Sequence, residues 1–439
     1  MTATSASMNI LIIGSGGREH AFAWKISQSP KCDKLFIAPG NAGTSSIGEN
    51  VPISPTAFPE IADFVVQNSI KLVVIGPEIP LALGIVDYFQ QRHDLRDVLL
   101  VGPDKKGALL ESSKDFAKQF MNKYHIPTAR YATFDRTGVE QGLNYIKEQN
   151  NPIVLKADGL AAGKGVVICE NQYEAQQVFK EMLLESKFGQ ASAKVVVEEF
   201  LQGIEISVFL LTDGKSYKIL PSAKDYKRIG DNDTGPNTGG MGAVSPVPFA
   251  DEDFMRKVEQ KIITPTIKGL QAEGIDYCGF IFLGLINVDG EPMVIEYNAR
   301  MGDPETQVVF PRISSDLVDL LLGAATKTLD QVELEIDPRS ACTVVMVSGG
   351  YPGNYQKGVP IEGLDAPTQN LVFHAGTETD PGKNSIITNG GRVLAVTAFG
   401  VRPRNAIRSA YETVNSISWK EVYFRKDIGQ DLLRETSTE

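Results

Sequence analysis

Hydrophobic residues in the first hundred positions form short runs separated by stretches in which apolar and polar residues mix. Four runs rich in aliphatic residues end in glycine or in proline beside glycine: NILIIG (9–14), KLFIAPG (34–40), KLVVIGPE (71–78) and DVLLVGP (97–103). Stretches with helical spacing lie between them: EHAFAWKIS (19–27), FPEIADFVVQN (58–68) and ALGIVDYFQQR (82–92). This alternation predicts a doubly wound parallel sheet of the α/β class.

The loops that follow these strands are predicted to form a ligand site. The carboxyl ends of parallel strands meet at one edge of a sheet, and such sheets bind ligands in the crevice beyond that edge. We therefore expect the loops after three of the strands to contact one ligand. The residues predicted there are Gly16, Gly17, Arg18, Glu19, Asn41, Gly76, Pro77 and Glu78.

The first of these loops, GSGGRE (14–19), leaves its ligand open when it is taken alone. A strand, glycines and a helix start present backbone N–H groups to a phosphate, as in dinucleotide sites of the G-x-G-x-x-G type. Glu19 stands where the third glycine of that motif belongs, which argues against NAD. Arg18 adds a cation suited to a phosphate monoester. A loop that binds nothing is the third possibility.

A second region begins near residue 111. The segment SSKDFAKQFMNKYHIP (112–127) predicts a capped helix that ends before Pro127. The β-branched runs at 152–168 and 193–211 predict strands. This mixture predicts an α+β domain.

A third region contains two further β-rich runs, CTVVMVSGGYPG (342–353) and NGGRVLAVTAFG (389–400). They predict a small β-rich domain at the C-terminal end. The predicted domain boundaries are therefore 1–110, 111–335 and 336–439.

The composition adds limits on partners and compartment. The chain has 439 residues, of which 42% are hydrophobic and 22% charged, as in ordinary globular proteins. A formal net charge of −11 argues against a nucleic-acid or anionic-membrane partner. No apolar run is long enough to predict a membrane span or a signal peptide. Four cysteines lie far apart without a C-x-x-C pair, which predicts reduced thiols and a cytoplasmic protein: Cys32, Cys169, Cys278 and Cys342.

A glycine-rich segment, GLAAGKG (159–165), resembles a phosphate-binding P-loop but lacks its spacing and its final Ser or Thr. Strand-like residues flank it, so we expect the tip of a β-hairpin that closes as a lid over phosphates. Lys156 would supply a fixed positive charge, beside Gly163, Lys164 and Gly165 at the tip. A purely structural hairpin turn is the alternative.

Two further segments carry polar residues in unusual places. Glu198 and Glu199 follow three valines, which suggests an edge strand whose backbone faces a ligand, or else a solvated strand end. The loop DNDTGPNTGGMG (231–242) is either disordered or functional, since its small residues permit close backbone approach to a ligand. The candidate binding residues in that loop are Asn237, Thr238, Gly239 and Gly240.

The segment VIEYNAR (294–300) predicts a strand with Glu296, Asn298 and Arg300 on one face. A carboxylate and an amide oxygen side by side are hard ligands suited to magnesium, and an arginine one step further can bind an anion. The alternative is the polar outer face of an antiparallel strand.

The order of these motifs resembles the ATP-grasp superfamily of carboxylate-amine ligases. The resemblance implies two α+β lobes that close on ATP, with a lid subdomain at about 130–195. It places adenine near Glu198, Glu199, Phe200 and Leu201, and the ribose on Glu205. It also implies that Lys114 and Lys156 reach the phosphates and that Mg²⁺ or Mn²⁺ binds Glu296 and Asn298. The preceding strand, GFIFLGL, lacks the additional acidic ligand of many members.

Eight fragments narrow the resemblance to the phosphoribosylamine-glycine ligases: GSGGREHA, APGNAGT, IGPE, KADGLAAGKGV, DTGPNTGGMGA, GDPETQ, TNGGRVL and RKDIG. This family implies ATP-dependent ligation of glycine to 5-phosphoribosylamine through glycyl phosphate, in de novo purine synthesis. Residues 16–19 would then hold a ribose 5-phosphate, and Arg300 the glycine carboxylate or acyl phosphate. Asp225, Asp303 and Glu305 are alternatives for the glycine ammonium.

Three other classes of function stay open at this point: another ATP-grasp ligase, an NAD-dependent oxidoreductase and a non-catalytic nucleotide sensor. Expected partners are small molecules, with no nucleic acid or membrane and a monomer or weak homodimer.

Overall fold

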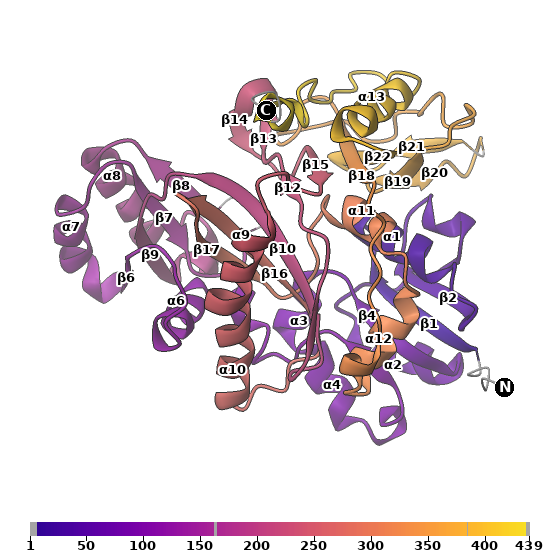
Figure 1. The fold of residues 1–439 in the computed structure, drawn as a ribbon, viewed down its shortest axis with the longest axis horizontal. Coiled ribbons are helices and arrows are strands. Elements are labelled where there is room, and N and C mark those ends of the chain that lie inside the picture. Colours follow the sequence, from indigo (N-terminus) through magenta and orange to yellow (C-terminus); the bar gives the residue numbers. More distant parts are fainter. Residues whose placement is uncertain (1–6, 162–164, 384, 436–439) are drawn as a thin grey trace.

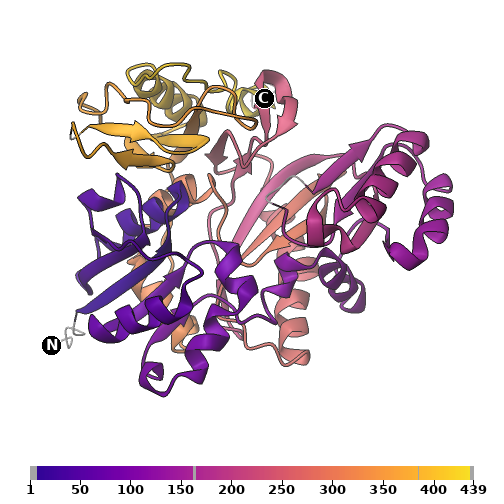
Figure 2. The same ribbon diagram turned by 180° about the vertical axis from the view of Figure 1, so that it is seen from behind.

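The structure is a computed structural model that describes residues 7–161, 165–383 and 385–435 (Figure 1). Gly163 and Lys164, two residues predicted at the lid tip, lie outside the described residues. In Figure 1 the N-terminal sheet lies at the lower right, the C-terminal region at the upper right and the lid at the left, with β10, β16 and β17 between them. Figure 2 shows the same three parts from behind.

The N-terminal region is a five-stranded sheet in the order β3-β2-β1-β4-β5, and all its pairings are parallel. Its strands are β1 (Met8–Gly14), β2 (Cys32–Pro39), β3 (Glu49–Asn50), β4 (Ile70–Ile75) and β5 (Leu99–Val101). The helices that connect them are α1 (Gly17–Ile26), α2 (Phe58–Gln67), α3 (Glu78–Leu83) and α4 (Ile85–Gln91). The predicted doubly wound parallel sheet is therefore confirmed.

Alternate residues of each strand pack on opposite faces of this sheet, as the pleat requires. Ile10 and Ile12 of β1 pack with Phe22 of α1, and Leu11 and Ile13 pack against α2. The first face is also covered by α12 (Leu317–Ala325), which comes from a segment assigned by sequence to the second domain.

The lid is a four-stranded antiparallel sheet in the order β6-β9-β7-β8. Its elements are β6 (Tyr131–Asp135), β7 (Ile153–Ala157), β8 (Val166–Cys169), β9 (Lys194–Glu199), α7 (Val139–Lys147) and α8 (Gln172–Leu184). Lys156 of β7 pairs with Val166 of β8, which confirms the predicted hairpin around residues 159–165. The β9 strand lies inside the sheet between β6 and β7, so the expectation of an edge strand there is wrong.

The central region is a second four-stranded antiparallel sheet, ordered β11-β10-β16-β17. Its strands are β10 (Ile204–Thr212), β11 (Tyr217–Ile219), β16 (Gly279–Val288) and β17 (Glu291–Asn298). Its helices are α5 (Leu109–Ser112), α6 (Lys114–Lys123), α9 (Glu252–Val258), α10 (Thr264–Ala272) and α11 (Thr306–Val309). The side chain of Ser113 caps α6 by accepting from the backbone of Phe116, as predicted.

The C-terminal sheet has the order β12-β15-β18-β22-β19. Its strands are β12 (Lys224–Asp225), β15 (Gly242–Ser245), β18 (Ser340–Val347), β19 (Leu371–His374) and β22 (Arg392–Gly400). The remaining elements are β13 (Arg228–Gly230), β14 (Thr234–Asn237), β20 (Thr377–Thr379), β21 (Ile386–Thr388), α13 (Pro403–Val414) and α14 (Gln430–Glu435). Two strands of this sheet, β12 and β15, thus come from before residue 336, so the predicted boundary separates strands that share a sheet.

Within the described residues, no helix combines the length and the apolar character needed to cross a membrane. All four cysteines are free thiols, with Cys169 and Cys342 fully buried.

Candidate active site

The glutamate of the first loop holds the loop together. Gly16 donates its backbone N–H to Glu19 Oε2 at 2.7 Å, which completes a capping box at the start of α1. The carboxylate lies between the ends of β1 and β4, because a β-carbon on Gly76 would lie 2.1 Å from Glu19 Oε1. Glycine at the end of β4 is therefore required by packing against this side chain.

The neighbouring arginine is also engaged within the protein. Arg18 Nε donates to Glu19 Oε1 at 2.6 Å, and its Nη1 donates to the carbonyl of Met301 at 3.1 Å. The backbone N–H of Arg18 donates to Asp303 Oδ2 at 3.4 Å. The loop predicted to cradle a phosphate thus joins the N-terminal sheet to the segment after β17.

Asn41 fixes the neighbouring loop. Its Nδ2 donates to the carbonyls of Ser15 and His374, at 2.8 and 2.9 Å, and its Oδ1 accepts from Gly43 and Thr44. These bonds tie the β1 and β2 loops to the C-terminal region. The structure therefore gives Asn41 a scaffolding role at the predicted edge.

Arg300 lies among acidic side chains just past the end of β17. Its Nη2 is 2.7 Å from Glu111 Oε1, and its Nε is 3.3 Å from Glu78 Oε2. Burial works against its charge, but Glu111 and Glu78 outweigh burial and raise the pKa of Arg300. Its Nε faces Glu78 without the geometry of a hydrogen bond, and its Nη1 donates to the carbonyl of Met301 at 3.1 Å.

Glu111 was missed by the sequence analysis. Besides pairing with Arg300, its Oε2 accepts from the backbone N–H of Ala299 at 2.8 Å. Burial raises the pKa of this carboxyl, and Arg300 opposes that shift. In the sequence Glu111 lies beside two serines at a helix start, and nothing in that segment indicates the contact with Arg300.

Glu296 and Asn298 project from β17 toward the cationic part of the site. Burial disfavours the charge of Glu296, but Lys227, Lys156, Lys114 and Arg300 outweigh it and lower the pKa of the carboxyl. The Asn298 side chain is buried, and its Nδ2 finds no hydrogen-bond partner in the described part of the chain. An ionised carboxylate beside an amide suits a hard cation, because carboxylate and amide oxygens are both ligands of such ions.

On β16, the strand that pairs with β17, the residues opposite Glu296 and Asn298 are not acidic. In the pairing of β16 with β17, Gly284 lies opposite Glu296 and Phe282 lies opposite Asn298. The described residues hold no group of three or more His, Cys, Asp or Glu side chains able to bind a metal. A cation here would complete its shell with oxygens from ligands or water.

Two predicted lysines converge from different elements. Lys114, at the start of α6, donates to the carbonyl of Gly159 in the lid hairpin at 3.2 Å. Lys156 on β7 donates to the carbonyl of Ile295 at 3.1 Å. The register between β16 and β17 shifts at Ile295, which turns this carbonyl toward the lysine. Both lysines therefore bridge the lid and central parts.

Glu198 explains how a carboxylate can occupy an interior strand. Its Oε2 lies 2.9 Å from Lys156 Nζ and 3.0 Å from Lys118 Nζ. All three side chains are nearly fully buried. The sequence analysis missed Lys118. This lysine lies on the apolar face of α6, which also buries Ala117 and Met121, and that position could have indicated a buried charge.

The residues that follow Glu198 are more exposed. Glu199 binds Arg130 through a 2.8 Å bond to its Nε and a 2.7 Å ion pair to its Nη2. Phe200 is 39% exposed, and Leu201 is half-buried. The segment thus leaves the sheet between lid and central strands, where the sequence predicted a nucleotide.

A second charged group surrounds Lys227. Its Nζ donates to Glu205 Oε2 at 2.8 Å, and Glu205, Asp225 and Glu296 raise its pKa despite burial. Burial also raises the pKa of the Asp225 carboxyl. The positive charge of Lys227 opposes this shift, and the negative charges of Glu205 and Glu296 add to it. Burial and the nearby Asp225 raise the pKa of Glu305 to about 7.

The glycine-rich loop is ordered by arginines of the C-terminal region, which the sequence analysis did not select. Arg392 Nη1 donates to the carbonyls of Gly239 and Asp303, both at 2.6 Å. Arg425 is 1% exposed and binds the base of the loop through a 2.6 Å ion pair with Asp233. The C-terminal region therefore closes one side of the site.

The other loop residues occupy different positions. Thr238 donates its backbone N–H and its hydroxyl to the carbonyl of Lys227, and Asn237 is exposed on β14. Gly240 has φ of 115°, and a β-carbon there would lie 2.4 Å from Pro304 Cδ. Glycine is needed at 240 because the loop packs on the segment after β17.

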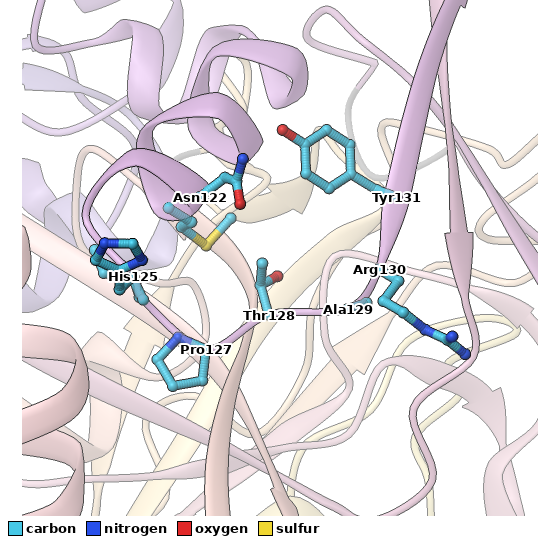
Figure 3. A pocket seen from close by; sticks show the side chains of 9 residues that line it. Asn122, His125, Pro127, Thr128, Ala129, Arg130 and Tyr131 are labelled. Carbon is cyan, nitrogen blue, oxygen red and sulfur yellow. The ribbon is translucent and has the colours of Figure 1, made fainter.

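A surface hollow of about 540 Å³ lies on the connection between α6 and β6 (Figure 3). Its lining residues are Met121, Asn122, His125, Ile126, Pro127, Thr128, Ala129, Arg130 and Tyr131. None of the predicted site residues is among them. The backbone of Pro127 accepts from Val294, so this connection also joins the central sheet before it enters the lid.

Comparisons with known proteins agree with this geometry. Sequence models of the phosphoribosylglycinamide synthetase family match its N domain to residues 8–111, its ATP-grasp (A) domain to 112–306 and its C domain to 341–431. A curated phosphoribosylamine-glycine ligase from Vibrio vulnificus is 48% identical over 429 residues, 96% of this chain and 98% of that protein. The protein of the same name from Pseudomonas aeruginosa is 47% identical over 427 residues, 96% of this chain and 97% of that protein.

Solved structures give the same result. A crystal structure of phosphoribosylamine-glycine ligase from Thermotoga maritima has a TM-score of 0.83 at 35% identity and covers 96% of this chain and 100% of that one. The biotin carboxylase domain of a Hydrogenobacter thermophilus carboxylase, solved with MgADP and bicarbonate, has a TM-score of 0.69 at 16% identity. The match covers 96% of this chain and 92% of that chain, and it shows a shared fold alone. The chain therefore belongs to the phosphoribosylglycinamide synthetase family and is an ATP-dependent ligase of purine biosynthesis.

Proposed function

We propose that this chain joins glycine to 5-phosphoribosylamine, giving glycinamide ribonucleotide, ADP and phosphate. The observation that carries the proposal is the meeting of Glu296 and Asn298 with Lys114, Lys156 and Arg300 at the junction of the lid, the central sheet and the N-terminal sheet. The positive charges of Lys114, Lys156 and Arg300 would neutralise a transferring phosphoryl group. A reaction of this kind needs no nucleophile from the protein.

The nucleotide would lie between the lid and central sheets. Lys114 and Lys156 would contact its phosphates, with Gly163, Lys164 and Gly165 of the hairpin closing over them. The segment Glu198, Glu199, Phe200 and Leu201 would hold the base, and Glu205 the ribose. Lys114 already contacts the lid hairpin, so closing the lid and binding phosphate would be linked.

Glu296 and Asn298 would hold Mg²⁺, or Mn²⁺, together with phosphate oxygens. When bound, the metal supplies positive charge to the transferring phosphoryl group. The protein's part is to keep Glu296 ionised through the lysines around it and to hold the Asn298 side chain on the same face of β17.

The first step joins the glycine carboxylate to the γ-phosphorus of ATP, and ADP leaves. Arg300 would hold the glycine carboxylate and then the acyl phosphate through its guanidinium group. Asp225, with Asp303 and Glu305 as alternatives, would hold the glycine ammonium. In the second step the amine attacks the acyl carbon, phosphate leaves and the new amide loses a proton.

The second substrate would bind at the edge of the N-terminal sheet. Its predicted contacts are Gly16, Gly17, Arg18, Glu19, Asn41, Gly76, Pro77, Glu78, Asn237, Thr238, Gly239 and Gly240. Arg18, Glu19 and Asn41 bind each other or the backbone, so they would act by fixing the shape of the loops. We also propose that the protein is cytoplasmic and a monomer or weak homodimer, as the sequence predicts.

The proposal is tested by following ADP release. We expect ADP to form only when ATP, a divalent cation, glycine and phosphoribosylamine are all present. Turnover with a different acid or amine would indicate another ATP-grasp ligase. ATP-induced thermal stabilisation without ADP release would indicate a nucleotide sensor, and stabilisation by NAD would support the oxidoreductase.

A further inference from the structure

The strand β12 and the two residues after it present their side chains alternately to two different surroundings. On one side, the Tyr226 hydroxyl donates to Asp431 Oδ1 of α14 at 2.6 Å, and the Lys224 ammonium pairs with Oδ2 of the same carboxylate. On the other side, Asp225 and Lys227 lie among the carboxylates of the candidate active site. Neighbouring side chains of an extended strand point to opposite faces. Asp431 and the active site therefore contact the two faces of one short strand.

The backbone of this strand forms a short ladder. β12 pairs with β15 through its two residues. Ala223, just before it, exchanges backbone bonds of 2.8 and 2.9 Å with Ser207 of β10, and Tyr226, just after it, donates to the carbonyl of Gly242 at 3.1 Å. A strand this short rests on a few backbone bonds, so side-chain contacts have a large share in fixing its position.

Tyr226 is a firm anchor for such contacts, because it is 3% exposed. Two cations lie near its ring: Lys224 Nζ is 5.3 Å and the guanidinium carbon of Arg425 is 5.2 Å from the ring centre. Burial disfavours the charge of Asp431, but hydrogen bonds from Lys224 and Tyr226 outweigh burial and lower the pKa of the carboxyl. The strand is thus held to an ionised carboxylate by two of its side chains.

The C-terminal segment that carries Asp431 also holds the chain beyond this strand. Arg425 Nη1 donates to the carbonyl of Arg228 at 3.1 Å, and Asp427 Oδ2 accepts from the backbone N–H of Asn232 at 2.7 Å. Figures 1 and 2 show this end of the chain, in yellow, beside β13 and β14. The C-terminal segment therefore contacts the stretch that follows the active-site residues as well as β12.

We propose that Asp431 is a positioning residue for the glycine subsite. By holding Lys224 and Tyr226 on one face of the strand, it sets how Asp225 projects into the site from the other face. The inference rests on the proposed function, in which Asp225 holds the glycine ammonium. A charge-assisted hydrogen bond of this kind depends on alignment, so loss of Asp431 should weaken the use of glycine. The use of ATP should change far less, because the residues assigned to ATP come from other elements.

The test follows ADP release while glycine or ATP is varied with the other substrates in excess. In Asp431→Ala the KM for glycine should rise about 10-fold, the low end for loss of a hydrogen bond to a charged group, because Asp225 is displaced but still present. The value of kcat and the KM for ATP should stay within about twofold of wild type. Tyr226→Phe keeps the buried ring and removes the hydroxyl that reaches Asp431, so it should also raise the KM for glycine alone.

Glu412→Ala is the matched control. It removes an exposed carboxylate of α13 in the same C-terminal region, where Glu412 pairs with Arg408. It should leave both KM values and kcat at the wild-type level. Thermal unfolding of each variant confirms that folded protein is compared.

A double-mutant comparison separates positioning from a general structural effect. Asp225→Asn should raise the KM for glycine about 100-fold. In that background Asp431→Ala should change the KM by less than about twofold, because Asp431 acts through Asp225. An undiminished effect there, or equal increases of the KM values for glycine and ATP in Asp431→Ala, would overturn the proposal.

The same variants distinguish this inference from the proposed function. An unchanged KM for glycine in Asp225→Asn would reject the glycine assignment in the proposed function and this inference with it. A raised KM in Asp225→Asn without any effect of Asp431→Ala would reject this inference alone.

Discussion

The side chain of Glu19 fills the space at Gly76, whose β-carbon, if present, would lie 2.1 Å from Glu19 Oε1. The same carboxylate lies against Gly14, at the end of the adjacent strand β1. A motif that suggested phosphate binding is therefore also a packing device that joins two strand ends to the start of α1.

Replacing Gly76 with Ala should disrupt this contact. The added methyl would push Glu19 away from the Gly16 N–H and from Arg18, and overpacking of a buried site costs about 1–3 kcal/mol. We expect a lower unfolding midpoint in urea and reduced ligase activity.

Gly138→Ala is the control for this change, because the nearest atoms to its β-carbon lie 3.6 Å away. It should leave both measurements close to wild type. An equal effect of the two substitutions would show that packing at Glu19 is unimportant.

Replacing Glu296 with Gln should stop ligation while the protein stays folded. The change keeps the shape of the side chain and removes the charge that the surrounding lysines hold, so ADP formation should fall at least about 100-fold. Steady-state rates at several Mg²⁺ concentrations, with circular dichroism for folding, check this.

Glu291→Gln changes an exposed carboxylate at the start of the same strand, paired with Lys257 and Lys261. It should keep near-normal turnover. Normal turnover of Glu296→Gln would remove the metal assignment.

Replacing Arg18 with Ala should lower the stability of the protein and weaken its use of one substrate. It leaves the buried Glu19 carboxylate without its partner, which typically costs about 3–5 kcal/mol. We also expect the KM for phosphoribosylamine to rise far more than the KM for ATP, because the loop lies at the edge of the N-terminal sheet and the nucleotide is proposed to bind between the lid and central sheets.

The exposed Arg96 of the same region is the control, and Arg96→Ala should change neither quantity. Equal increases of the two KM values in Arg18→Ala would contradict the assignment of the second substrate to this edge.

Replacing Glu305 with Gln should change how stability depends on pH. Because the pKa of Glu305 is raised in the folded protein, the fold retains a proton between about pH 4.5 and 7 that the unfolded chain has released. Stability from this group is therefore present at low pH and is lost as the pH rises through 7. Gln does not titrate, so the variant should gain stability relative to wild type between pH 5 and pH 8.

Thermal unfolding at these two pH values measures the effect. The exposed Glu60→Gln serves as the control and should follow wild type at both. A constant difference between Glu305→Gln and wild type would show that this carboxyl does not titrate in that range.

The sequence alone was sufficient for features that depend on neighbours in the chain. Strand and helix periods predicted the parallel sheet, and glycines marked the strand ends. Alternation along 294–300 placed Glu296 and Asn298 on one face. Such features follow from local backbone geometry, which repeats with a fixed period.

Tertiary structure decided which distant groups meet. Nothing local to Lys118 or Glu111 indicates that one binds Glu198 and the other Arg300, because those partners come from other elements. The same reason explains why β9 was mistaken for an edge strand. A buried carboxylate is tolerated inside a sheet only when cations reach it, and here Lys118 and Lys156 come from a helix and a neighbouring strand that only the fold brings together.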